Sequence, residues 1–184
     1  MADEHQTSGP AQLLLDYAHL FSQRTMKGAV LDLACGDGHN GLFLAERGLP
    51  VVLMDRSSEA LERARKLAEE KGRPVSIRQV DLEKEGVNPL DQDLFGGIII
   101  FRYLHRPLIP CIRKALRGGG ILLYETFTME QPRFGKPRNP DFLLEPGELK
   151  GWFRDWDLIH CFEGIEHDPD RAIARIVCKK PLNP

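Results

Sequence analysis

Two aspartates and a glycine-rich turn are the residues with the clearest chemical potential. Asp32 interrupts the apolar run 30–34, which opens into a turn containing Gly36 and Gly38, and Asp55 ends the next apolar run. Glycines let a backbone bend sharply and approach a ligand closely. A carboxylate at the end of a strand can accept hydrogen bonds from both hydroxyls of a ribose. Together these residues predict a site for a nucleoside-bearing cofactor.

The spacing of the glycines is compatible with two cofactors, a dinucleotide or S-adenosylmethionine. With Gly41 included and Asp55 downstream, the turn matches the dinucleotide-binding fingerprint. Asp32 favours S-adenosylmethionine instead, because a cofactor with an amino-acid tail carries an ammonium group that needs a carboxylate or a water held by one. His39 and Asn40 crowd the start of the following helix, so no clear pyrophosphate cradle is present.

Alternating strands and helices must bring these residues to one edge of a sheet. Apolar runs predict strands at 29–34, 51–55, 75–80, 98–101 and 121–126. Periodicity and capping signals predict helices at 11–24, 39–47, 58–71 and 146–154, and a further helix that begins at Pro107 and ends at the glycines 118–120. Two β-rich runs, 156–163 and 172–179, are joined by a short loop. The expected fold is α/β: a single-domain, doubly wound, Rossmann-like sheet, mostly parallel, with a C-terminal antiparallel hairpin.

Composition limits the classes of protein. The chain has 184 residues, which suits one domain, expected at 11–180 between flexible tails at 1–10 and 181–184. The net charge of −2 gives no global basic bias toward nucleic acid, and no apolar run is long enough to span a membrane. The four cysteines are scattered without a Cys-x-x-Cys pair, which predicts reduced thiols in a cytoplasmic protein and no metal site.

From about Lys27 to Lys180 the chain resembles the class I S-adenosylmethionine-dependent methyltransferases. Four segments carry this resemblance in the order of the family: 30–38, 54–55, 80–82 and 116–122. A narrower similarity is to the tellurite-resistance-type (TehB-like) branch, and it rests on 31–36, 103–108, 124–127 and 139–144. Gly96 and Gly97 depart from the family at the entry to the fourth strand, where an aspartate is common.

The resemblance implies S-adenosylmethionine as cofactor and assigns residues to its parts. The methionine end is implied at the first turn and at Phe101, the ribose at Asp55, and the adenine at Arg56, Asp81 and Leu82. The full implied cofactor site is Asp32, Ala34, Gly36, Gly38, Asn40, Asp55, Arg56, Asp81, Leu82 and Phe101.

The methyl acceptor is expected beside the end of the fourth strand. Arg102, Tyr103 and His105 follow that strand and are the candidate catalytic residues: Tyr103 or His105 could position or deprotonate an acceptor, and Arg102 could hold an anionic one. His105 could equally be structural. Residues 127–145 should lie over the carboxyl edge of the sheet, either as a lid that selects the acceptor or as an ordinary surface loop.

Three functions remain in competition. The leading hypothesis is in-line transfer of a methyl group from S-adenosylmethionine to a small acceptor, such as an oxyanion, a chalcogen or a small organic acid. The second is a methyltransferase acting on RNA or protein, and the third is a dinucleotide-binding or non-catalytic module. The sequence leaves the acceptor and the oligomeric state open.

Overall fold

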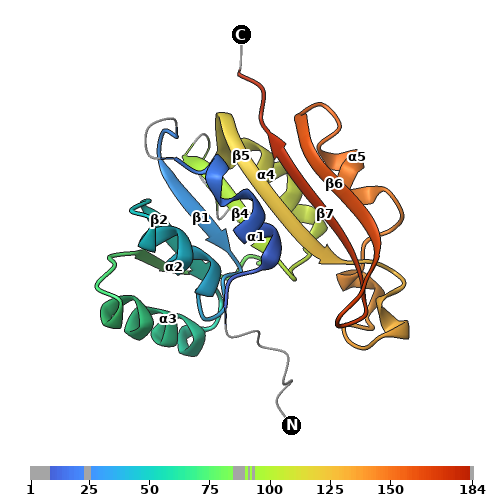
Figure 1. The fold of residues 1–184 in the computed structure, drawn as a ribbon, viewed down its shortest axis with the longest axis horizontal. Helices are drawn as coiled ribbons and strands as arrows, with labels where there is room; N and C mark the ends of the chain where they lie inside the picture. The colour runs from blue at the N-terminus through green and yellow to red at the C-terminus, as the bar shows by residue number, and fades with distance from the viewer. Residues whose placement is uncertain (1–8, 23–25, 85–89, 91, 93, 183–184) are drawn as a thin grey trace.

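A central sheet organises the molecule. The structure, a computed structural model, describes residues 9–22, 26–84, 90, 92 and 94–182. Seven strands lie in the order β3-β2-β1-β4-β5-β7-β6 (Figure 1). Their bounds are β1 Ala29–Leu33, β2 Val51–Asp55, β3 Ser76–Gln79, β4 Phe95–Phe101, β5 Leu116–Phe127, β6 Asp157–Glu166 and β7 Arg171–Lys179. The first five are parallel, and β7 runs antiparallel between β5 and β6, so the predicted fold class is confirmed.

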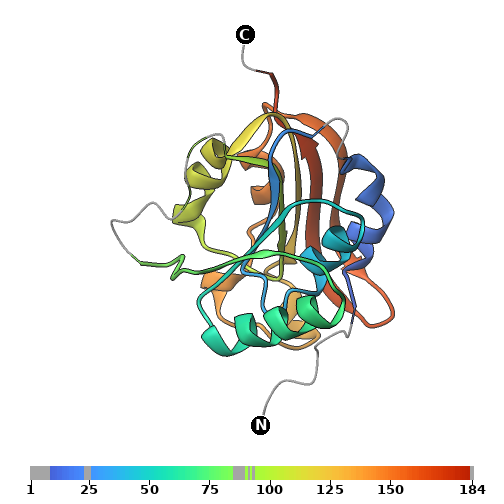
Figure 2. The same cartoon turned by 90° about the vertical axis from the view of Figure 1, so that its left-hand side faces the viewer.

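Helices cover both faces of this sheet. On one face lie α1 (Gln12–Tyr17), α2 (His39–Glu46) and α3 (Ser58–Glu70), and on the other lie α4 (Ile109–Ala115) and α5 (Glu148–Trp152). Figure 2 shows the sheet between α1 and α4. Short 3-10 turns complete the connections: η1 Ala18–Leu20, η2 Arg106–Leu108, η3 Gln131–Arg133 and η4 Pro140–Phe142. No helix in the described ranges is long and apolar enough to cross a membrane.

Alternation along β1 divides the core into two layers. Leu31 and Leu33 join the apolar cluster on the α4 side, whereas Val30 joins the cluster under α1, α2 and α3. Successive strand side chains point to opposite faces, so Asp32 lies on the same side as Val30. It is 2% exposed and is the one charged residue in the otherwise apolar β1.

Several predicted boundaries were wrong: β4 and β5 begin earlier than predicted, β6 ends later, and two further errors concern the first helix and a glycine run. The helix expected at 11–24 ends at Tyr17 and continues only as η1, and residues 23–25 lie outside the described chain. The glycines 118–120 do not form a turn after a helix, because α4 ends at Ala115 and these glycines belong to β5. The register of β5 against β4 shifts between Phe95 and Gly97 of β4, so the glycines 118–120 occupy an irregular start of β5. The tails predicted at 1–10 and 181–184 lie largely outside the described residues.

Gly96 and Gly97 give β4 a tightly packed entry. The strand begins at Phe95, just before them. A Cβ at Gly96 would lie 2.6 Å from the Lys27 carbonyl oxygen, and one at Gly97 would lie 2.7 Å from Phe21 Cε1. The pair therefore lets the segment before β1 cross close to the strand, which accounts for glycine where the family commonly has an aspartate.

We expect Gly96→Ala to lower the free energy of unfolding by about 1–3 kcal/mol, because its new methyl group meets backbone that cannot move aside cheaply. Gly151→Ala is the matched control. It adds the same methyl group in α5, where a Cβ meets nothing within 4 Å, so stability should stay level or rise by up to about 1 kcal/mol. Urea unfolding measures both, and equal stability of the two variants would contradict the packing argument.

Candidate functional site

The turn after β1 opens the site at the carboxyl edge of the sheet. Ala34, Gly36 and Gly38 all have positive φ angles, of 54°, 53° and 76°. Gly38 is the residue from which α2 begins. A Cβ at Gly36 would meet no atom within 4 Å, so open space lies in front of the turn. The chain thus bends sharply here and leaves its backbone accessible to a ligand.

Asp55 connects this turn to the end of β2. Its Oδ2 accepts a hydrogen bond from the Gly36 amide at 2.8 Å, and its Oδ1 accepts one from the Ser57 amide at 2.9 Å. Each carboxylate oxygen can accept more than one hydrogen bond, so the pair of oxygens keeps capacity for a ligand. Ser57 in turn caps α3, as its side chain accepts from the Ala60 amide. The predicted juxtaposition of Gly36 and Asp55 is therefore present.

Asp32 lies beneath the same turn. Its Oδ2 accepts a hydrogen bond from the Gly41 amide at 2.7 Å. Burial raises its pKa from 3.8 to about 7, the Gly41 hydrogen bond acts in the opposite direction, and the negative charge of Asp55 adds to the increase. A buried carboxylate poised near neutrality is typical of functional sites.

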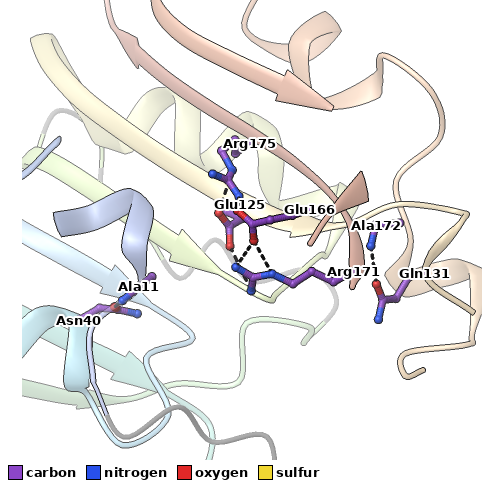
Figure 3. Close-up of polar contacts among 8 residues, drawn as sticks. All are labelled: Ala11, Asn40, Glu125, Gln131, Glu166, Arg171, Ala172 and Arg175. Atoms are coloured by element: carbon purple, nitrogen blue, oxygen red, sulfur yellow. Dashed lines mark hydrogen bonds and ion pairs between the residues drawn. The ribbon is translucent and has the colours of Figure 1, made fainter. Parts of the chain in front are cut away.

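Asn40 has a structural contact that the sequence did not predict. Its Oδ1 accepts a hydrogen bond from the Ala11 amide at 2.8 Å, which holds the start of α1 against the start of α2 (Figure 3). The first helix is therefore attached to the turn that carries Gly36 and Gly38. Asn40 adjoins the predicted site, and its side chain serves at least this positioning role.

The ends of β2 and β3 carry a second group of predicted residues. Arg56 forms an exposed ion pair with Glu83 at 3.8 Å. Asp81 Oδ1 accepts from the Glu83 amide at 3.0 Å, which fixes the turn after β3. Leu82 is buried in the α4-side cluster, so its side chain anchors this turn to the core.

The end of β4 carries Phe101 and the three candidate catalytic residues. Arg102 has a φ of 56°, and its amide donates to the Glu125 carbonyl at 2.9 Å. Partial burial lowers the pKa of Arg102, and the positive charge of Arg171 lowers it further. The negative charge of Glu125 acts in the opposite direction. Tyr103 packs partly against the α4-side core, and His105 is half-buried just before η2.

Four charged residues form an ionic cluster next to Arg102 that the sequence did not predict: Glu125, Glu166, Arg171 and Arg175 (Figure 3). Arg175 Nε lies 3.1 Å from Glu125 Oε2, Arg171 Nη1 lies 3.8 Å from Glu125 Oε1, and both arginines also pair with Glu166. Burial raises the pKa of Glu125, although the arginines counteract it. A signal was available: Arg171 and Arg175 are four residues apart on one strand, and such residues share a face.

The segment 127–145 is held in place at both ends. Gln131 is buried, and its Oε1 accepts from the Ala172 amide at 2.9 Å (Figure 3). Its Nε2 donates to the Lys136 carbonyl at 3.0 Å. Arg106 makes a two-pronged ion pair with Glu148 at 2.7 and 2.8 Å and donates to the Leu143 carbonyl at 2.8 Å. The segment follows β5 at the carboxyl edge, where it was expected, and is secured to β7 and η2.

Known proteins resemble the chain in sequence and fold. Residues 30–120 match the family model described as a methyltransferase domain. TehB of Haemophilus influenzae, a probable S-adenosyl-L-methionine-dependent methyltransferase, is 26% identical over 157 residues, or 82% of this chain and 54% of that protein. A tRNA 5-carboxymethoxyuridine methyltransferase of Escherichia coli is 31% identical, with 71% of this chain and 60% of that protein covered.

A crystal structure of TehB from Haemophilus influenzae matches the fold with a TM-score of 0.79 at 20% identity, and covers 96% of this chain and 64% of that one. Together with the site at the carboxyl edge, these likenesses define a class, and the chain belongs to the class I S-adenosylmethionine-dependent methyltransferases. Within that class it is TehB-like. The chain spans about half the length of the TehB protein that it matches.

The residues present fit the cofactor that this class implies, S-adenosylmethionine. Open space in front of Gly36 lies beside the Asp55 carboxylate, which has acceptor capacity for ribose hydroxyls. Asp32 lies beneath the same turn, and the ammonium group of an amino-acid tail bound there would favour its ionised form.

Asp32→Asn should change how stability depends on pH. The folded protein retains a proton on Asp32 that the unfolded chain releases above pH about 4, so the wild-type free energy of unfolding falls as pH rises from 4 to 7. The variant cannot ionise there. Its stability relative to wild type should therefore increase over this window, by at most about 4 kcal/mol for a pKa raised to about 7. Urea unfolding at pH 4.5 and pH 8, taken as roughly the two ends of this window, measures the change, and a pH-independent difference would contradict the raised pKa.

Proposed function

We propose that the chain transfers the methyl group of S-adenosylmethionine to a small anionic acceptor by in-line attack. When bound, the cofactor supplies a methyl group activated by a sulfonium. The protein must then align donor and acceptor and exclude water, and no covalent intermediate on the protein is required.

Different parts of the carboxyl edge of the sheet suit the two parts of the cofactor, the nucleoside and the methionine portion. We assign the nucleoside to the β2 and β3 ends, with Asp55 accepting from the ribose, Asp81 and the Leu82 backbone meeting the adenine, and Arg56 beside it. We assign the methionine portion to the turn after β1. There the backbone of Ala34, Gly36 and Gly38 approaches the ligand, Asp32 balances the ammonium group, Asn40 orients the start of α2, and Phe101 closes the end of β4.

The single observation that carries the acceptor assignment is the charge on β5, β6 and β7 beside the end of β4. Three arginines, 102, 171 and 175, face two glutamates, 125 and 166, which leaves one net positive charge. Burial is the main cause of the lowered pKa of Arg102, and the charge of Arg171 adds to it, so a bound anion would stabilise the charged guanidinium. An acceptor that is already anionic needs no general base, and His105 would then orient the acceptor.

A methyltransferase acting on RNA is the second candidate. One observation favours it: a relative that is 31% identical is named for a tRNA nucleoside. Arg133, Lys136 and Arg138 are exposed on the segment after β5 and could contact phosphates. The two candidates differ in where the necessary cations lie, at Arg102 after β4 or on the segment after β5.

The state of the cysteines supports a cytoplasmic location, which we also propose. All four cysteines are free thiols in the structure. Reduced thiols are typical of proteins in reducing compartments.

Asp55→Ala should weaken the binding of S-adenosylhomocysteine, the demethylated cofactor, by at least about thirtyfold, because charge-assisted hydrogen bonds to the ribose are lost. Asp155→Ala is the control, since Asp155 pairs with Arg113 on the surface and should leave the affinity unchanged. Titration calorimetry measures both affinities. An unaltered affinity in Asp55→Ala would overturn the ribose assignment.

Arg102→Gln should raise the KM for an anionic acceptor about tenfold, with little effect on S-adenosylhomocysteine affinity, because it removes one acceptor-side charge. Arginine and glutamine carry a similar backbone strain at the positive φ of position 102, so the substitution should not change that strain. The assay follows methyl transfer to inorganic oxyanions, small carboxylates and bulk tRNA, with Arg133→Gln as the exposed control. The small-acceptor proposal would be contradicted if tRNA were the only acceptor, and if this activity were lost in Arg133→Gln but retained in Arg102→Gln.

A further inference from the structure

The backbone of Tyr103 is fixed at the carboxyl edge. It follows β4 directly after the strained Arg102. Its carbonyl oxygen accepts a hydrogen bond at 3.0 Å from the hydroxyl of Tyr124, a buried residue of β5. The core of the sheet therefore holds the backbone of Tyr103 in place just after β4.

The hydroxyl group of Tyr103 is a buried polar atom without a hydrogen-bond partner among the described residues. Arg175 Nε is the other such atom in the described ranges, but it lies in an ion pair with Glu125. Buried hydroxyl groups in folded proteins are normally hydrogen-bonded. An orphaned one at the edge of a candidate site is the property expected of a group that acquires its partner when a ligand binds.

The charges around this hydroxyl locate it at one end of the site. Burial raises the pKa of Tyr103, and the carboxylates of Glu83, Asp81 and Asp55 raise it further while Arg56 lowers it. All four charged residues belong to the ends of β2 and β3, not to β5 or β7. The ring thus extends from β4 toward the side of the site that we assign to the nucleoside, away from the ionic cluster around Glu125.

We infer that the Tyr103 hydroxyl donates a hydrogen bond to the nucleoside part of S-adenosylmethionine, and that Tyr103 is a cofactor-binding residue and not a base for the acceptor. The inference rests on the proposed function. The hydroxyl remains protonated at neutral pH, so it serves as a donor, and the ring nitrogens of adenine and the oxygens of ribose are suitable acceptors.

Titration calorimetry of Tyr103→Phe tests this inference with two ligands. S-adenosylhomocysteine contains the nucleoside and the amino-acid tail, whereas 5′-methylthioadenosine contains the nucleoside without the tail. Loss of one hydrogen bond should weaken both ligands by the same factor, about threefold to tenfold. Tyr17→Phe is the matched control, because Tyr17 lies on α1 with its ring 5.4 Å from that of His160, and both affinities should be unchanged.

Thermal unfolding separates binding from a structural role. Removing an orphaned buried hydroxyl should leave the melting temperature of ligand-free Tyr103→Phe equal to or above that of wild type, and the increase on adding S-adenosylhomocysteine should be smaller. Wild-type affinity for both ligands in Tyr103→Phe would overturn the inference alone. Failure of the wild-type protein to bind S-adenosylhomocysteine would instead overturn the proposed function.

Discussion

The hydrogen bond from the Gly41 amide to the buried Asp32 carboxylate determines how the first helix after β1 meets the sheet. Gly41 has no room for a side chain, since a Cβ there would lie 2.4 Å from Leu53 Cδ2 and 3.0 Å from Asp32 Oδ2. α2 therefore approaches β1 and β2 closely, and the turn before it must bend through positive φ angles. That bend exposes the Gly36 amide to Asp55, so the geometry of the proposed cofactor end depends on one buried carboxyl group.

The two ends of the proposed site are built from different kinds of chemical groups. The proposed cofactor end consists of backbone groups and aspartates near the ends of β1, β2 and β3, positioned by short-range turns. The proposed acceptor end consists of long charged side chains that follow β4 or lie on β5, β6 and β7, and their charges largely balance. A balanced cluster is rigid when its members are partly buried, and replacement of one charge there changes the affinity of the remaining ones for an anion. Variation at the second end can therefore alter the acceptor without disturbing the first.

Local signals account for what the sequence predicted. β2 was predicted as 51–55 to the residue, because its apolar run lies between a proline and charged residues. Asp32, Gly36 and Asp55 were singled out from equally local signals, and the structure brings Gly36 and Asp55 into hydrogen-bond contact. The helix at 11–24 was predicted too long because η1 buries Ala18 on the same face as α1, so periodicity continues where the α-helix has stopped.

Tertiary contacts account for what the sequence missed. Glu125 and Arg175 meet only because β5 pairs with β7 in one register. The length of the glycine run at 118–120 suggested a turn, but an irregular strand accommodates it equally well. The backbone position of Tyr103 depends on a hydrogen bond from Tyr124, which lies on another strand, and no pattern in the sequence specifies that contact.

The position of β7 has a consequence for the order of assembly. This strand is the last of the sheet in sequence, yet it is inserted between β5 and β6 and carries both arginines that pair with Glu125. During synthesis the proposed cofactor end can form from β1 to β4, while Glu125 lacks its two ion-pair partners on β7 until residues 171–175 have emerged. Pairing between segments so distant in sequence forms slowly. In the proposed assignment, a nascent chain would therefore form the methyl-donor end before the acceptor end is complete.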